Sequence, residues 1–380
     1  MFPIEFTNPQ PVDGRGREDP WLNMRIGVDA RKISDTGIGS YIQRLIPALL
    51  AAEPEHRYVL FMAPEDVGSF LFPADRVETV PASAGKYSLR EHWALGALAR
   101  RAGVELFHEP HFTLPLYMPC KRVVTIHDVI HLLDPAVGAI QKKYARWMIS
   151  SALKRADQII TVSHHSQRNL VEMFGADPAK ITVTHNAPDP ALSPMGRGEL
   201  AAELARLNLT PGYFLFVGSD RPHKNIKAVA AAMALMAEDT RFVIVGRVGP
   251  PARAPFGQFG GRVSFVGQVG THTIAALYSG AQALFFPSYL EGFGLPPIEA
   301  MALQTPVVAA NRSSIPEVTG DAAALVDPDD ARSAAMLLER IRSDQTFRSA
   351  LVEKGIKRAA SFSWKTAAQA TLAVYERAMK

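Results

Sequence analysis

The sequence contains a single cysteine, Cys120, among its 380 residues, so no disulfide can form within the chain. A reducing compartment is therefore the simpler expectation, and we expect a cytoplasmic protein. The longest apolar stretches, residues 45–52 and 228–237, are shorter than the roughly 18 residues that a membrane-spanning helix needs. The sequence thus argues against a protein that crosses a bilayer.

Dense clusters of positive charge are also missing. The net charge is only +4, and the basic residues are scattered in short groups such as Arg100 and Arg101. Proteins that bind nucleic acid gather such residues on one face, so we expect no nucleic-acid partner. The mild positive excess still suits anionic phosphates or an anionic membrane face.

The first 23 residues lack the apolar segment that a secretory signal requires. Their proline, glycine, aspartate and arginine residues follow no periodic pattern, which predicts a disordered extension. Met24 directly precedes a strand-like run, so a translation start at Met24 is an alternative, which an N-terminal mass measurement would decide.

The chain does hold enough apolar material for two sizeable cores. Hydrophobic residues make up 47% and charged residues 21% of the sequence, as in ordinary globular proteins. Single cores stop growing at roughly 250–300 residues, so a chain of this length predicts two domains and a cleft between them.

Short apolar, β-branched runs alternate with helix-length segments along the whole chain. This alternation predicts α/β domains with parallel sheets that helices cover on both faces. The strands are expected at residues 24–30, 58–63, 77–81, 104–108, 123–127, 158–163 and 181–185, and again at 213–218, 241–246, 263–266, 283–287, 306–310 and 323–326. In the first half, helices are expected at residues 38–52, 90–102, 139–155 and 166–174.

Between the two halves, residues 187–212 are rich in proline and small polar residues and contain one short helical stretch. This texture is typical of a hinge. We therefore expect two Rossmann-like, doubly wound domains, at residues 24–190 and 191–362. In such sheets ligands bind beyond the carboxyl ends of the strands, so the residues that follow each strand are the site candidates.

The most informative stretch is Ser288–Glu299, with the sequence SYLEGFGLPPIE. A strand is expected to end just before it, and Pro296 and Pro297 suit the first turn of a helix. A loop that leads into a helix N-terminus offers free backbone N–H groups, which bind phosphate. Gly292 and Gly294 let the backbone approach a ligand closely.

Two acids flank this loop. Glu299 is expected in the first turn of the helix and Glu291 on the loop before it, so both can face one pocket. Their expected task is to accept hydrogen bonds from sugar hydroxyls. The alternative is that Glu299 only complements the helix dipole and that Glu291 is solvated.

A second candidate, Gly218–Asn225, lies at another strand-to-helix junction. Its cations Arg221 and Lys224 can neutralise a departing diphosphate, which is the main electrostatic task in cleaving a sugar–phosphate bond. Lysine and arginine near a helix are, however, commonly just solvated.

His127 and Asp128 follow a buried-looking strand and form a third candidate. The histidine can position a sugar hydroxyl while the aspartate orients its ring or acts as a base. A capping aspartate beside a structurally satisfied histidine is the alternative.

Gly37 and Gly39 follow the first strand and open the first helix. The third glycine of a dinucleotide fingerprint is absent at the usual spacing, so NAD binding is poorly supported. A glycine loop that contacts the donor phosphate or the acceptor fits better.

Several catalytic signatures are absent. The string Asp327-Pro-Asp329 matches the Asp-x-Asp pattern of metal-dependent sugar transferases, but acids that open a helix are ordinary caps. No His/Cys/carboxylate cluster has metal-ligand spacing in the sequence, and neither a Gly-x-Ser-x-Gly elbow nor a Walker loop occurs.

Together, the stretch Glu291–Glu299, the Gly218–Asn225 loop, the His127–Asp128 pair and the Gly37–Gly39 loop resemble the retaining family-four (group 1) glycosyltransferases. The resemblance extends over nearly the whole chain from Met24, and its most specific part is the two-glutamate signature. It implies a GT-B fold, with two Rossmann-like domains facing across a cleft. It also implies that a last helix in residues 363–380 crosses back to the first domain, which would bind the acceptor.

The resemblance further implies that Lys224 and Arg221 hold the donor diphosphate and that Glu299 binds the ribose. Glu291, with the backbone of residues 293–295, would hold the sugar, and His127 would touch it. The donor-binding residues expected are Gly37, Gly39, Gly218, Arg221, Lys224, Gly292, Phe293, Gly294, Leu295 and Glu299, and the catalytic candidates are His127, Asp128 and Glu291. Many relatives have arginine where this chain has His223. Whether Arg221 or another cation takes that arginine's place at the diphosphate is left open by the sequence.

Such enzymes retain the anomeric configuration, and the resemblance implies that neither a metal nor another cofactor is needed. The expected donor is GDP-mannose, because the Arg-Pro-His-Lys-Asn form resembles bacterial polysaccharide mannosyltransferases. UDP-glucose, UDP-N-acetylglucosamine and dTDP-rhamnose are alternatives. The expected acceptor is a saccharide or lipid-linked intermediate in polysaccharide or glycolipid synthesis, met at the inner membrane face through peripheral contact.

Three rival functions fit parts of the pattern. A glycosidase would use Glu291 and Glu299 as an acid and nucleophile pair, although a helix N-terminus disfavours a proton donor. A sugar-nucleotide epimerase would share the architecture. A non-catalytic protein that binds nucleotide sugars would bind the donor without turnover.

Overall fold

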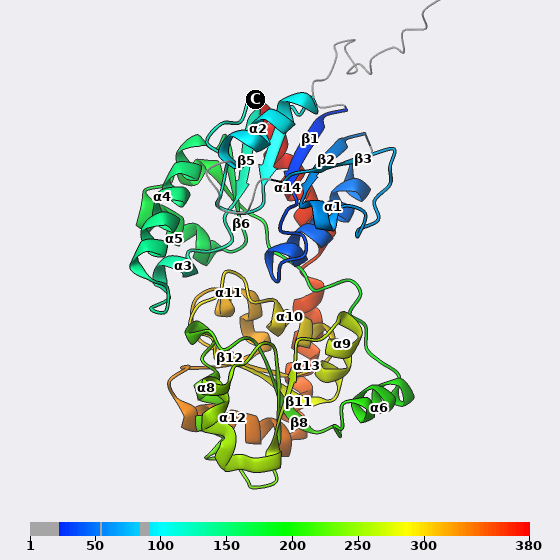
Figure 1. The fold of residues 1–380 in the computed structure, drawn as a ribbon. Helices are drawn as coiled ribbons and strands as arrows, with labels where there is room; N and C mark the ends of the chain where they lie inside the picture. The colour runs from blue at the N-terminus through cyan, green and yellow to red at the C-terminus, as the bar shows by residue number, and fades with distance from the viewer. Residues whose placement is uncertain (1–22, 54, 84–90) are drawn as a thin grey trace, which may run out of the picture. The chain divides into compact units, whose positions relative to one another are not determined.

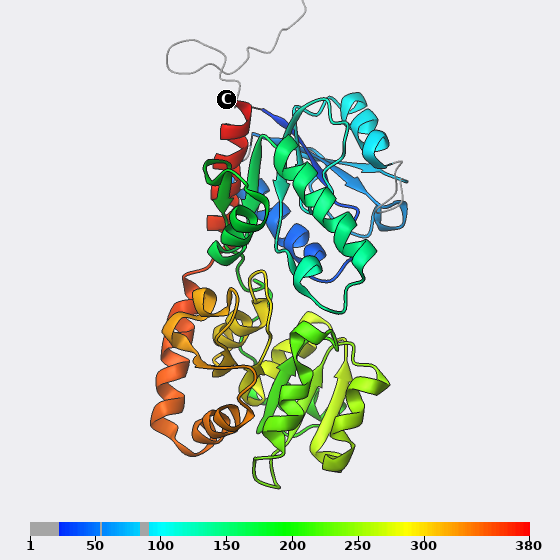
Figure 2. The ribbon, with the colours of Figure 1, turned by 90° about the vertical axis from the view of Figure 1, so that its left-hand side faces the viewer.

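The computed structural model describes residues 23–53, 55–83 and 91–380. The predicted disordered extension therefore lies outside the described residues, apart from Asn23. Within the described parts the chain forms two parallel β-sheets with helices on both faces, which confirms the predicted α/β class (Figures 1 and 2).

Seven of the described strands form the first sheet, in the order β3-β2-β1-β4-β5-β6-β7. Each predicted strand of the first half is present, with ends that move by up to two residues. The strands are β1 (Arg25–Asp29), β2 (Arg57–Met62), β3 (Val77–Pro81), β4 (Leu106–Glu109), β5 (Lys121–Thr125), β6 (Gln158–Thr161) and β7 (Ile181–Val183).

The helices of this part follow the predicted pattern and add one short turn, α3. They are α1 (Ile38–Ala52), α2 (Glu91–Arg101), α3 (Ile130–Leu133), α4 (Ala139–Arg155), α5 (His164–Phe174) and the last helix, α14 (Trp364–Met379). Helix α5 begins two residues earlier than predicted because the Ser163 hydroxyl caps it, accepting the backbone N–H of Ser166. Helix α14 reaches the first sheet, where the Tyr375 hydroxyl lies 2.7 Å from Nδ1 of buried His108.

The second sheet has the described order β10-β9-β8-β11-β12-β13. Its strands are β8 (Tyr213–Val217), β9 (Phe242–Val245), β10 (Val263–Gly267), β11 (Ala281–Phe286), β12 (Val307–Ala310) and β13 (Ala324–Val326). Its helices are α6 (Arg197–Arg206), α7 (Ile226–Met233), α8 (Pro250–Arg253), α9 (Thr271–Ser279), α10 (Leu295–Ala302), α11 (Ile315–Thr319), α12 (Ala331–Ser343) and α13 (Gln345–Ala360). Short 3₁₀ turns occur at η1 (Pro64–Asp66), η2 (Pro178–Lys180), η3 (Pro222–Lys224), η4 (Ala254–Arg262) and η5 (Gly320–Ala322).

Strand β8 shows why the second sheet is buried on both faces. Phe214 and Phe216 pack into a core that α7 and α12 cover, whereas the alternate residues Tyr213 and Leu215 pack into a core that α9 and α10 cover. Successive side chains of a strand point to opposite faces, so a run of large apolar residues requires a helical layer on each side.

By packing, the chain divides into two compact units. The first unit contains the described residues within 1–126, 148–160 and 368–380, and the second unit contains residues 127–147 and 161–367. Residues 127–147 and 161–190 precede the predicted boundary at residues 190 and 191, but they pack with the second unit. Units defined by packing need not coincide with domains defined along the sequence, so the predicted domain limits stay a prediction. No helix in the described part of the chain combines the length and the apolar character needed to cross a membrane.

The second sheet reverses its strand order between β8 and β11. Strands β9 and β10 lie on one side of β8, and β11, β12 and β13 lie on the other. Ligands of doubly wound sheets bind at such a reversal, beyond the carboxyl ends of the two strands. The loops that follow β8 and β11 are the two predicted candidates, Gly218–Asn225 and Ser288–Glu299.

Candidate active site

The two candidate loops contact each other directly. The backbone N–H of Tyr289 donates to the His223 carbonyl at 2.8 Å. The Lys224 Nζ atom lies 2.6 Å from Oε1 of Glu291 and 5.6 Å from the centre of the Phe286 ring. The lysine side chain is 21% exposed and the glutamate side chain 9%. The fold therefore brings the predicted cation and the predicted acid together in one partly buried pair.

The other basic residues of the Gly218–Asn225 loop differ in environment. Arg221 is exposed at the start of η3, whereas His223 is buried, with its Nδ1 atom 2.6 Å from Oδ2 of Asp134. Burial raises the pKa of Asp134, but the hydrogen bond from His223 and the nearby charges lower it overall. His223 is thus engaged by Asp134 and Lys224 by Glu291, whereas Arg221 is the exposed basic residue of this loop.

The Glu291–Glu299 turn leads into α10 as predicted. Gly294 has φ 96° and precedes the helix, which begins at Leu295 with the two prolines in its first turn. No described residue accepts a backbone hydrogen bond from the N–H groups of Gly292, Phe293 or Gly294. A helix N-terminus with free N–H groups is suited to an anion.

The predicted place of Glu299 needs a correction. Helix α10 begins at Leu295, so Glu299 is its fifth residue, and its first turn contains no acid. The positive φ of Gly294 starts the helix one residue before the prolines, which moves Glu299 beyond that turn. Its Oε2 atom accepts a hydrogen bond from the buried Tyr278 hydroxyl at 3.2 Å. Burial and the Glu299 charge raise the pKa of Tyr278, so the phenol stays a donor.

His127 and Asp128 lie against the same turn. A Cβ atom on Gly292 would be 2.8 Å from the His127 carbonyl oxygen and 3.1 Å from the Asp128 Cβ, so only glycine fits here. The Asp128 carboxylate accepts the backbone N–H of Ile130 at 2.9 Å. This contact forms a local turn ahead of α3, whose N-cap is Val129 and has no side-chain cap. The catalytic role of the pair stays a prediction.

Gly37 and Gly39 belong to the first unit and have structural roles of their own. Gly37 has φ 78° just before α1, and a Cβ atom on Gly39 would lie 2.3 Å from the Ile33 carbonyl oxygen. Both positions therefore need glycine to form the turn, whether or not the turn also contacts a ligand.

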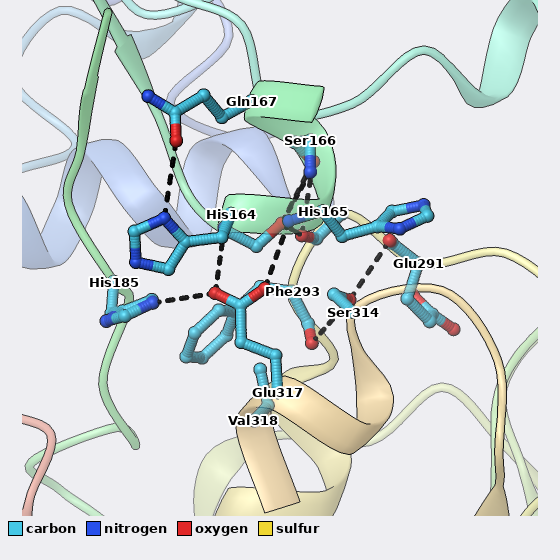
Figure 3. A network of polar contacts seen from close by, with 12 residues as sticks. His164, His165, Ser166, Gln167, His185, Glu291, Phe293, Ser314, Glu317 and Val318 are labelled. Carbon is cyan, nitrogen blue, oxygen red and sulfur yellow. Dashed lines mark hydrogen bonds and ion pairs between the residues drawn. The ribbon is translucent and has the colours of Figure 1, made fainter. Parts of the chain in front are cut away.

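One cluster beside the turn was missed by sequence reasoning (Figure 3). The Glu317 carboxylate accepts the backbone N–H groups of His164 at 2.8 Å and His165 at 3.0 Å and lies 2.9 Å from Nε2 of His185. Burial raises the pKa of Glu317, but these hydrogen bonds lower it to about 2. The partners are 132 to 153 residues apart in the chain, so no spacing could reveal them.

Within the described residues, His164, His185 and Glu317 are the one group of three potential metal ligands, with ligand atoms within 4.8 Å of one another. Three N–H donors already satisfy the carboxylate, as expected for an acid that caps the N-terminus of α5. The prediction that no metal is needed is not tested by this arrangement.

Two family profiles match the chain. "Glycosyltransferase Family 4" matches residues 36–192, and "Glycosyl transferases group 1" matches residues 202–358. Among curated relatives, O-antigen chain mannosyltransferase B of Escherichia coli is 27% identical over 370 residues, covering 90% of this chain and 96% of the relative. O-antigen chain mannosyltransferase RfbU of Salmonella typhimurium is 30% identical over 256 residues, covering 66% and 69%.

Solved structures share the fold. A sucrose-phosphate synthase from Thermosynechococcus elongatus superposes with a TM-score of 0.78 at 22% identity, covering 93% of this chain and 98% of that chain. The Anabaena protein HepE in complex with UDP and glucose gives a TM-score of 0.75 at 16% identity, covering 93% and 100%.

Proposed function

Because this chain belongs to the family-four, group 1 glycosyltransferases and has their GT-B fold, we propose that it is a retaining hexosyltransferase that uses a nucleotide-sugar donor. The donor we propose is GDP-mannose, and the acceptor is a saccharide or lipid-linked intermediate of polysaccharide or glycolipid synthesis. The names of the mannosyltransferase relatives support mannose. Other donors are the second candidates.

The observation that carries this proposal is the arrangement at the strand-order reversal. Lys224 comes from the loop after β8, and the three N–H groups of residues 292–294 come from the loop after β11. A fixed cation and preorganised N–H donors both stabilise the charge that develops on a departing diphosphate. In the proposed mechanism they hold the donor's diphosphate and stabilise it as the bond to the sugar breaks.

The two acids of the turn have separate roles in this mechanism. Glu291 is held by Lys224 beside the expected phosphate position, so its carboxylate accepts hydrogen bonds from the sugar hydroxyls. Glu299, on α10, accepts from the Tyr278 hydroxyl and, in the proposal, from the ribose. A leaving phosphate oxygen takes the proton of the acceptor hydroxyl on the same face of the sugar, which retains the configuration without a metal.

The glycosidase alternative fits less well. Oε1 of Glu291 accepts a hydrogen bond from the Lys224 ammonium at 2.6 Å, as an anionic carboxylate does. A glycosidase acid must instead carry a proton in the ground state, so the acid would have to be Glu299. Glu299 accepts a hydrogen bond from the Tyr278 hydroxyl.

A ligand panel tests the proposed function. The melting temperature is measured with GDP-mannose, GDP, UDP-glucose, UDP-N-acetylglucosamine and dTDP-rhamnose, each in excess over its dissociation constant. A ligand at about 100 times its dissociation constant stabilises the native state by about 2.7 kcal/mol, so we expect a rise of several degrees with GDP and GDP-mannose. A shift with another nucleotide would change the donor, and no shift with any nucleotide would contradict the function.

Turnover is then measured as nucleotide release from GDP-mannose, with and without a bacterial lipid extract as acceptor. Acceptor-dependent release is expected. Binding without release in any acceptor mixture would favour the non-catalytic binding protein, and release of an epimerised sugar nucleotide would favour the epimerase.

The proposed location is the cytoplasm, with peripheral contact to the inner membrane face. The outward face of α4 supports that contact, because Ile140 is 83% exposed and Trp147 50% exposed. Lys143 and Arg146 are exposed on the same helix. Exposed apolar side chains among cations suit an anionic lipid surface.

Cosedimentation with vesicles tests this contact. We expect the chain to bind vesicles that contain phosphatidylglycerol and not vesicles of pure phosphatidylcholine. The double variant Ile140→Glu, Trp147→Glu is expected to lose most of this binding. Met336→Glu is the matched control, because Met336 is 66% exposed on α12. Equal binding by all three proteins would contradict the contact.

A further inference from the structure

Serine hydroxyls hydrogen-bond the backbone carbonyls of the turn at residues 291–294, which bears the free N–H groups. The Ser313 hydroxyl donates to the Glu291 carbonyl at 2.7 Å and accepts the Glu291 N–H at 3.0 Å. The fully buried Ser314 hydroxyl lies 3.0 Å from the Glu291 and Phe293 carbonyl oxygens. These two serines precede α11 and so anchor the first and the third carbonyl of the turn.

A third serine, from a distant part of the sequence, anchors the carbonyl between them. The fully buried Ser163 hydroxyl donates to the Gly292 carbonyl at 2.6 Å. Ser163 also caps α5, and the neighbouring Ser166 hydroxyl donates to the His127 carbonyl at 2.8 Å. We call Ser163, Ser313 and Ser314 the serine collar; all three belong to the second unit.

Peptide geometry links the serine collar to the free N–H groups. None of the described peptide bonds is cis, and in a planar trans peptide the C=O points opposite to the N–H of the next residue. Carbonyls 291, 292 and 293 point at the serines, so the N–H groups of Gly292, Phe293 and Gly294 point away from them. Successive backbone N–H groups of a turn that have no partner within the chain can form an anion-binding concavity.

Glu317 joins the two segments that bear the serines (Figure 3). It lies on α11, which begins directly after Ser314, and its carboxylate accepts the first two backbone N–H groups of α5, which Ser163 caps. Ser313 itself has φ 60°, a left-handed conformation that costs a non-glycine residue energy. The chain before α11 is therefore strained at Ser313, the residue whose hydroxyl hydrogen-bonds the Glu291 backbone.

We propose that Ser163, Ser313 and Ser314 are positioning residues, which hold three backbone N–H groups in the orientation that binds the donor's diphosphate. The inference rests on the proposed function, because it concerns the same turn. The serines themselves contact no phosphate, since their hydroxyls are occupied by the carbonyls. When the serine hydroxyl that hydrogen-bonds its carbonyl is removed, a peptide unit can rotate. Its N–H then no longer points at the proposed phosphate position.

The test compares a nucleoside diphosphate with its nucleoside, since only the diphosphate depends on the collar. Isothermal titration is run with GDP and guanosine, and with UDP and uridine as a second pair. We expect Ser314→Ala to weaken the binding of the preferred diphosphate about ten-fold. The backbone N–H groups that this serine orients would bind a charged phosphate, and hydrogen bonds to charged groups are worth more than those between neutral groups. Affinity for the nucleoside should stay unchanged.

Two further variants keep the test decisive. Ser163→Ala should give the same selective loss, and it replaces Ser314→Ala if that protein does not fold. Tyr213→Phe is the matched control, because it also removes a buried hydroxyl that donates to a carbonyl, that of Leu277 at 2.8 Å, at the opposite end of β8. It should bind both ligands like the wild type.

Folded serine variants with unchanged diphosphate affinity would overturn the inference, as would an equal loss for diphosphate and nucleoside. Either result would leave the proposed function standing. A wild type that binds none of GDP, UDP and dTDP would overturn the proposed function together with the inference.

Discussion

Replacing Lys224 by methionine is expected to lower kcat/KM for the donor about 10²- to 10³-fold, the effect of removing one preorganised donor to a developing negative charge. The lysine lies at the strand-order reversal, is 21% exposed, and is held by Glu291 at 2.6 Å. A partly buried ammonium acts on a phosphate more strongly than a solvated one, because less water screens it. The loss should appear in steady-state nucleotide release at several donor concentrations.

Matched variants separate this effect from general damage. Lys227→Met removes an exposed lysine three residues further along and should leave the rate unchanged. Lys224→Arg keeps the charge but changes its geometry, so it should restore only part of the rate. Equal rates in the Lys224→Met variant and the wild type would show that the Lys224 ammonium does not stabilise the departing diphosphate.

Replacing Glu291 by glutamine should have the second largest effect, a loss of about 10- to 10²-fold in kcat/KM. The change keeps the shape of the side chain but removes the charge that accepts from sugar hydroxyls and orients Lys224. The melting temperature is measured beside the rate, because the same change leaves a partly buried ammonium without its anion.

The control for this variant is Glu353→Gln. Glu353 also pairs with a lysine at 2.6 Å, Lys357, but both side chains are more than 70% exposed on α13. Exposed pairs contribute little, so neither rate nor melting temperature should change. If Glu291→Gln behaved like Glu353→Gln, the acid would have no role in the reaction.

The fold followed from the sequence because its signals are local. Apolar runs such as Tyr213–Val217 require helical cover on both faces, and turn residues such as Gly294 mark where one element gives way to the next. Small errors arose where a side chain or a backbone angle decides the boundary, as at the Ser163 cap of α5 and the start of α10, which moved Glu299 out of the first turn.

The sequence predicted only those parts of the site that directly follow the end of a strand, the loops after β8 and β11. Both loops were found because parallel strands bring their carboxyl ends to one edge, and the family resemblance then assigned them to one ligand. The pairs His223 with Asp134 and His185 with Glu317 join residues 89 and 132 positions apart. Such pairs depend on how elements pack, and no spacing in the sequence encodes them.

In the proposed function, the loops after β8 and β11 together hold the donor's diphosphate. The most direct test is a crystal structure of the wild-type chain with the nucleoside diphosphate that the ligand panel selects. We expect phosphate oxygens about 3 Å from Nζ of Lys224 and from the backbone N–H groups of Gly292, Phe293 and Gly294. A diphosphate bound elsewhere, with this turn and Lys224 facing only water, would contradict it.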